Sequence, residues 1–81
     1  MNNEIYVVAR YRGYFKLIGL PFRPMKDDKI TDKEISMTVD GILINKDIEE
    51  GIMIYVTIAN ASYNDQEDLY MDMTNKGWRK G

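Results

Sequence analysis

The chain has 81 residues, 44% of them hydrophobic and 30% charged, with 11 basic and 13 acidic side chains. It contains no cysteine and no histidine, which excludes disulfides, thiolate or imidazole metal sites, thiol nucleophiles and the commonest general base. The length predicts a single domain over residues 1–81. The missing side chains predict a protein that binds and does not catalyse.

Residues 4–20 alternate in the manner of a β-hairpin. Arg12-Gly13 is a suitable two-residue turn, because glycine readily adopts a positive φ. The implied cross-strand pairs are Tyr11–Tyr14, Arg10–Phe15 and Val8–Leu17. Both faces of this hairpin carry apolar side chains, so the alternation does not decide which face lies inside.

The middle of the chain predicts a loop, a second hairpin and a further strand. Residues 25–33 are charged and have no apolar period, so we expect an exposed loop there. The alternating residues of 35–44 surround Asp40-Gly41, the strongest short-range signal for a hairpin turn. A turn at 49–51 then leads into 52–59, where β-branched residues predict a central strand.

The period becomes helical after Ser62. Asn64 followed by Glu67 fits a capping box, and an apolar stripe follows at helical spacing, formed by Leu69, Tyr70 and Met73. Gly77 is a natural C-terminal cap, and we expect Trp78 to fold back onto the core. These elements predict an α+β fold: a five-stranded antiparallel meander (two hairpins plus a central strand) with one C-terminal helix packed on one face.

Charge is segregated along the chain. Residues 1–26 hold five basic side chains against one acid, 27–72 hold twelve acids against three lysines, and 73–81 hold three basic side chains. An acidic surface of this kind can meet a basic partner or can simply keep the protein soluble. The candidate partner-binding acids are Glu49, Glu50, Asp65, Glu67, Asp68 and Asp72.

The first hairpin offers a second candidate surface, which is basic and aromatic. Aromatic rings stack on bases, and arginine adds cation–π and phosphate contacts. The alternative explanation is ordinary cross-strand packing, and only one of the two hairpin faces can be exposed. The candidate residues for nucleotide or nucleic-acid binding are Tyr6, Arg10, Tyr11, Arg12, Tyr14 and Lys16.

We expect no catalytic residues, no metal site and no cofactor. Asp27-Asp28 and Glu49-Glu50 are adjacent acids without the spacing of a calcium loop. No apolar run reaches the ~20 residues that span a membrane, and the N-terminus is not basic like a signal peptide. We therefore expect a cytoplasmic protein with no membrane partner.

Residues 65–73 read Asp-Gln-Glu-Asp-Leu-Tyr-Met-Asp-Met. This segment is similar to an acidic helix in one family of Cas9-inhibiting anti-CRISPR proteins, and the chain as a whole resembles small accessory inhibitors of phages and mobile elements. The resemblance covers about nine residues and overall character, and the basic first hairpin departs from it. It implies an acidic α+β inhibitor that blocks a nucleic-acid groove in the host cytoplasm.

Two principal functional hypotheses follow. The first is a phage-encoded inhibitor that binds a host defence protein through charged and aromatic surface. The second is a binder of nucleotides or single-stranded nucleic acid that uses the first hairpin. Self-assembly into a homo-oligomer through edge strands is a third hypothesis.

Overall fold

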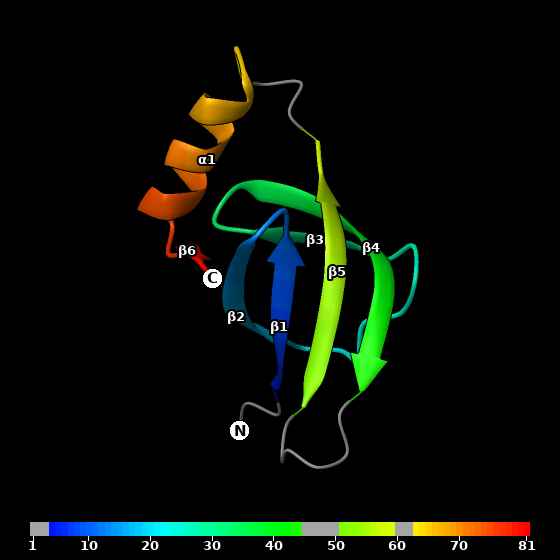
Figure 1. Ribbon diagram of the computed structural model, residues 1–81. Coiled ribbons are helices and arrows are strands. Elements are labelled where there is room, and N and C mark those ends of the chain that lie inside the picture. Colours follow the sequence, from blue (N-terminus) through cyan, green and yellow to red (C-terminus); the bar gives the residue numbers. More distant parts are fainter. Residues whose placement is uncertain (1–3, 45–50, 60–62) are drawn as a thin grey trace.

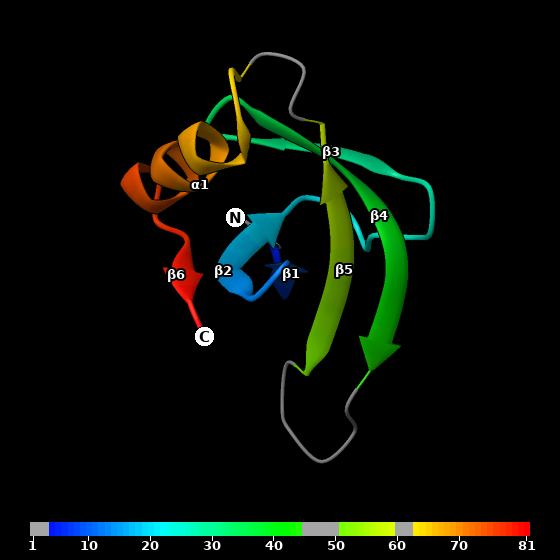
Figure 2. The same ribbon diagram turned by 45° about the horizontal axis from the view of Figure 1, so that its top comes forward.

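Figure 1 shows a computed structural model of the chain, which describes residues 4–44, 51–59 and 63–81. The elements of this part of the chain are β1 (Ile5–Tyr11), β2 (Tyr14–Leu20), β3 (Lys29–Asp32), β4 (Ile35–Ile44), β5 (Ile52–Ile58), α1 (Gln66–Asn75) and β6 (Arg79–Lys80). The strands form a curled sheet in the order β3-β4-β5-β1-β2-β6 (Figures 1 and 2).

The predicted α+β class and the first hairpin are confirmed. β1 and β2 pair in the expected register, with Tyr11 opposite Tyr14 and Val8 opposite Leu17. Arg12 and Gly13 both have positive φ, at 48° and 81°, as a two-residue hairpin turn that follows the sheet twist requires.

The predicted antiparallel meander matches the sheet only roughly, because six strands are present in the described residues and one pair is parallel. β5 lies beside β1 in parallel register, with Ala9 opposite Ile54. The chain leaves β2 and crosses to the far edge of the sheet before it forms β3 (Figure 1). The last long strand therefore returns to the middle of the sheet, beside the first.

Asp40-Gly41 is a bulge in one long strand and not a hairpin turn, so this prediction is wrong. β5 pairs with both halves of β4, placing Val56 opposite Val39 and Tyr55 opposite Gly41, so that Asp40 is the extra residue. A continuous partner strand on both sides outweighs the local turn preference. Asp40 also accepts a hydrogen bond from the Thr57 hydroxyl.

The second hairpin lies earlier in the chain, within the predicted loop. β3 and β4 pair through a turn at Lys33-Glu34, where both residues have positive φ, 48° and 70°. Ile30 is the buried residue of β3 and lies opposite Met37. A single apolar residue among charges gives no period, which explains why the sequence does not reveal this strand. The predicted turn at 49–51 falls partly outside the described residues.

Alternate strand residues meet α1 in one core. Its buried members are Val7, Ala9, Tyr11, Ile18, Leu20, Ile30, Ile35, Met37, Val39, Ile54, Val56, Ile58, Leu69, Met73 and Trp78. The expected return of Trp78 to the core is confirmed, since its side chain is 1% exposed. Gly77 has a φ of 102° and ends the helix, whereas the N-cap is Asp65, one residue after the predicted Asn64.

A candidate binding surface on the outer face of the sheet

The two faces of the sheet differ in what covers them. The core face packs against α1, while the opposite face, here called the outer face, has no helix over it in the described part of the chain (Figures 1 and 2). Strand alternation assigns side chains to the two faces. On β1, for example, Val7 and Ala9 are buried in the core, whereas Val8 and Arg10 lie on the outer face.

An apolar row crosses the outer face over four neighbouring strands. The pairing registers place Leu43 of β4, Met53 of β5, Val8 of β1 and Leu17 of β2 directly opposite one another. Leu17 is 62% exposed and Leu43 52% exposed. A sheet face that only water covers usually carries polar side chains, so this row is a departure from ordinary strand patterning.

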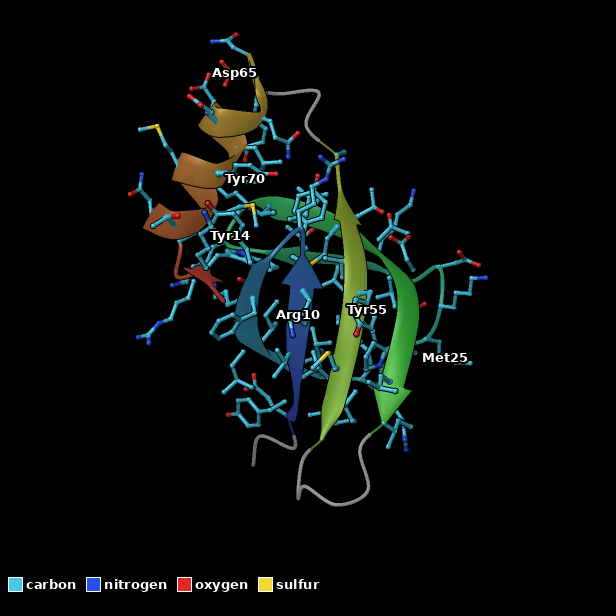
Figure 3. All side chains as sticks on the ribbon, in the orientation of Figure 1. Arg10, Tyr14, Met25, Tyr55, Asp65 and Tyr70 are labelled. Atoms are coloured by element: carbon cyan, nitrogen blue, oxygen red, sulfur yellow. The ribbon has the colours of Figure 1, made fainter. Side chains whose placement is uncertain are left out.

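A second row runs beside the first and alternates aromatic rings with guanidinium groups. It consists of Tyr55 of β5, Arg10 of β1, Phe15 of β2 and Arg79 of β6, in register across four strands. Figure 3 shows Arg10 and Tyr55 next to each other on the outer face. At about 4.8 Å between strands, this row spans roughly 14 Å.

We call the two rows together the outer patch. It consists of Val8, Arg10, Phe15, Leu17, Leu43, Met53, Tyr55 and Arg79. The patch holds no lysine and no carboxylate, and Asp40, which lies at its border, is paired with Thr57. Aromatic residues, methionine and arginine in one cluster, with lysine and acids depleted, are typical of protein interfaces.

The six candidate residues of the first hairpin do not form one surface. Tyr6 and Arg10 lie on the outer face, and Arg12 lies in the turn with its guanidinium 5.6 Å from the centre of the Tyr11 ring. The other three point to the core side. Tyr11 is 8% exposed, and Tyr14 stacks on Tyr70 of α1 with ring centres 4.9 Å apart (Figure 3).

Lys16, the sixth candidate, links three elements on the core side. Its Nζ lies 2.5 Å from Asp32 Oδ2 at the end of β3 and donates a 2.7 Å hydrogen bond to the carbonyl of Lys76 after α1. Its side chain is 12% exposed. The turn between β3 and β4 accordingly lies close to α1 in both ribbon views (Figures 1 and 2). This ammonium group is committed to holding the helix onto the sheet.

The candidate acids divide in a similar way. Glu49 and Glu50 lie outside the described residues. Asp65 is the N-cap of α1 and accepts a 2.9 Å hydrogen bond from the Asp68 N–H. Glu67 and Asp68 occupy the first turn, where the helix dipole favours negative charge. These acids therefore have a local role in starting the helix.

Asp72 is held by two neighbours. It accepts a 2.6 Å hydrogen bond from the Tyr63 hydroxyl, and the Lys76 ammonium lies 3.1 Å away. The hydrogen bond from Tyr63, followed by that from Lys76, lowers the pKa of Asp72. The same bond, with burial and the nearby negative charge, raises the pKa of Tyr63 to about 12. This cluster fixes the residues before α1 to the helix.

The described residues contain two shallow hollows. One of about 230 Å³ is lined by Tyr14, Tyr70, Met71, Thr74 and Asn75. The other, of about 350 Å³, lies at the edge of the outer patch and is lined by Phe15, Lys16, Leu17, Gly77 and Arg79. Within residues 4–44, 51–59 and 63–81, no three acidic side chains gather as metal ligands would. The helix in that part of the chain is too short to cross a membrane.

Of the six candidate residues of the first hairpin, only Arg10 belongs to the patch, and sequence reasoning gave no functional role to Val8, Leu17, Leu43, Met53 and Tyr55. The available signal was the presence of apolar residues on both faces of the first hairpin and of β5, which covers all of these except Leu43 of β4. Comparison with protein-family models, curated proteins and solved structures gave no match.

Proposed function

We propose that this protein is a non-catalytic binding protein that docks onto a protein partner through the outer patch. The observation that carries the proposal is the apolar row that crosses four strands at the solvent-facing surface, with Leu17 and Leu43 more than half exposed. Burial of apolar surface is the main driving force of protein association. Exposed apolar rows of this kind mark interaction sites.

The chemistry of the second row supports the same conclusion. Tyrosine and arginine are the side chains that most often dominate binding energy at protein interfaces. Arg10 and Tyr55 lie opposite each other in the middle of the patch. An interface centred on this pair would bury it and leave the more exposed Leu17 and Leu43 toward the margins.

Inhibition of a host defence protein, which the resemblance in residues 65–73 implies, is one form that this function can take. In that case the acids of the helix would steer the protein toward a basic partner, and the outer patch would supply the close contacts. Electrostatic steering affects mainly the association rate, whereas buried apolar contacts slow dissociation.

The test compares capture of partner proteins from the source cell by the wild type and by the double variant Leu17→Ser/Tyr55→Ser. We expect the double variant to lose at least ten-fold of the specifically captured protein. Quantitative mass spectrometry measures the loss, and circular dichroism checks that the variant is folded.

The matched control is Met71→Ser, because Met71 is also exposed (65%) but lies on α1, away from the outer patch. This variant should capture the partner as well as the wild type does. Equal capture by the double variant, or equal loss with Met71→Ser, would show that the outer patch is not the docking surface.

One observation favours a second function, the binding of single-stranded nucleic acid. In the row Tyr55, Arg10, Phe15 and Arg79, rings that could stack on bases alternate with cations that could meet phosphates. Fluorescence titration with labelled oligonucleotides and a cyclic dinucleotide separates the two functions. Micromolar, salt-dependent binding that Phe15→Ala abolishes would favour nucleic acid, and the absence of binding at high micromolar concentration would reject it.

A further inference from the structure

Part of one edge of β2, beside the outer patch, has no strand paired with it in the described residues. β2 pairs with β1 along its whole length, from Tyr14 to Leu20. On its other side it pairs with β6 only at Tyr14 and Phe15. In the described residues, no strand lies beside the remaining part of β2 on that side.

The hydrogen-bonding pattern shows which groups point to this edge. The Gly81 N–H donates to the Gly13 carbonyl at 2.8 Å, so the polar backbone groups of residue 13 face β6. Successive residues of a strand direct their N–H and C=O groups to alternate edges. The N–H and C=O groups of Phe15, Leu17 and Gly19 therefore point to the same edge. Those of Phe15 face Arg79 of β6, whereas those of Leu17 and Gly19 lie past Arg79, where β6 no longer runs beside β2.

This edge could accommodate both the backbone and an apolar side chain of an added strand. The 350 Å³ hollow lies next to it, lined by Phe15, Lys16 and Leu17 of β2, by Gly77, and by Arg79 at the start of β6. Leu17 is the most exposed member of the apolar row. A strand added here would continue both the sheet and the apolar row by one position.

The charges along the edge are of opposite sign. Arg79 is exposed at the hollow. At the other end, the Glu4 carboxylate lies over Gly19, where an added Cβ would be 2.6 Å from Glu4 Oε2. An added segment would thus meet a positive charge at one end and a negative charge at the other.

The opposite edge of the sheet is protected in the usual ways. β3 has four residues, and exposed lysines lie at its start and just after its end, Lys29 and Lys33. Short edge strands and lysines discourage strand pairing. β2 has neither feature at Leu17 and Gly19.

From these observations we infer the mode of docking, which deepens the proposed function and rests on it. We propose that an extended segment of the partner protein pairs as a strand with β2 at Leu17 and Gly19. It places an acidic side chain against Arg79 and an apolar side chain in the hollow beside Leu17. Backbone hydrogen bonds supply affinity and these two side chains supply specificity, as in other cases of strand addition.

The test uses a linear heptapeptide selected by display on the folded full-length protein as the probe. We expect the selected peptides to share one acidic residue and alternating apolar residues. NMR amide exchange then reports the contact. In the free protein the Leu17 and Gly19 amides should exchange quickly and those of Ile18 and Leu20 slowly, and the peptide should slow Leu17 and Gly19 at least ten-fold.

Two variants check the side-chain contacts. Arg79→Glu should weaken binding of the selected peptide at least ten-fold. The same variant should bind well to a peptide in which lysine replaces the acidic residue. Leu17→Lys should weaken binding similarly, whereas the control Met71→Lys should not.

Failure to enrich any peptide, or a bound peptide that leaves Leu17 and Gly19 unprotected, would overturn the inference. Protection of both amides in the free protein together with a dimer in light scattering would also overturn it, since the occupant would then be a second copy. Because Leu17→Ser/Tyr55→Ser tests the outer patch with the partner itself, the proposed function can survive if strand pairing fails.

Discussion

The core face and the outer face of the sheet are built from similar side chains but differ in what covers them. Ile54 and Tyr55 are neighbours on β5, yet Ile54 is fully buried and Tyr55 is 48% exposed. The core face is covered by Leu69 and Met73 of α1 and by Trp78, which follows the helix. On the outer face the apolar side chains have no such cover among the described residues. Apolar composition alone therefore does not identify a core, and the identity of a face depends on what packs against it.

The largest expected difference is between two truncations, one of a side chain on the core face and one of a side chain on the outer face. Ile54→Ala leaves a cavity in the core and should cost about 2–5 kcal/mol of unfolding free energy. A chain of this size has roughly 3–5 kcal/mol to lose, so this variant should lose most of its stability. Leu17→Ala should change the unfolding free energy by no more than about 0.5 kcal/mol.

Urea unfolding followed by the fluorescence of Trp78, the single tryptophan, measures both variants. Leu17→Ala should keep its stability and lose partner binding. Equal destabilisation by the two substitutions would mean that the outer face is packed as tightly as the core, and the outer patch would then no longer be a free surface.

The next effect concerns the polar link on the core side. Lys16→Met keeps the aliphatic stem but leaves the Asp32 carboxylate and the Lys76 carbonyl without their ammonium partner. Losing a partly buried, charge-assisted hydrogen bond should cost about 1–3 kcal/mol. The same urea titration measures it.

The double variant Lys16→Met/Asp32→Asn is the control for this link. It removes the unpaired carboxylate and should recover part of the lost stability, since removing both partners of an ion pair costs less than removing one. A double variant as unstable as the sum of both single variants would indicate that the two side chains act independently.

The local parts of the fold could be predicted from the sequence, and the long-range parts could not. The register of β1 and β2 follows from a two-residue turn, and the position of α1 follows from helical spacing. The parallel pairing of Ala9 with Ile54 joins residues far apart in the chain, and no local signal specifies it. At Asp40-Gly41 the local signal was strong but was outweighed by β5, which pairs with both sides of it.

The candidate site was missed for a related reason. The pattern of the first hairpin showed that both of its faces are apolar, but not which face the helix covers. Once residues of α1 join the core that contains Val7 and Ala9, the outer face is fixed as the side of Val8 and Arg10. The proposed surface thus depends on one tertiary contact that the spacing of residues cannot supply.

A smaller effect is expected at a turn that shares no residue with the outer patch. Glu34 has a φ of 70°, a conformation that costs a residue with a Cβ roughly 1 kcal/mol. Glu34→Gly should therefore raise the unfolding free energy by about 1 kcal/mol and leave binding through the outer patch unchanged. Glu34→Ala, the matched control, should give no gain. A change in binding would place this turn in the interface.

The smallest effect concerns the contact between Tyr63 and Asp72, whose contribution to stability should be lost at both extremes of pH. The pKa of Asp72 is lowered from 3.8 in the folded protein, so its contribution is present above about pH 4 and is lost as pH falls through the folded pKa. The pKa of Tyr63 is raised from 10.0 to about 12. Its contribution is therefore complete below pH 10 and is lost between pH 10 and about 12.

Tyr63→Phe should remove the part of the pH dependence of stability that comes from the hydrogen bond between Tyr63 and Asp72, at both low and high pH. The melting temperature of this variant should differ from the wild type most at pH 7 and least below pH 3 and near pH 12. The matched control is Tyr55→Phe, which changes a phenol on the outer face and should follow the wild-type profile. A difference in melting temperature that does not change with pH would mean that the hydrogen bond from Tyr63 to Asp72 contributes nothing to stability, so that the segment before α1 is held against the helix by its other contacts.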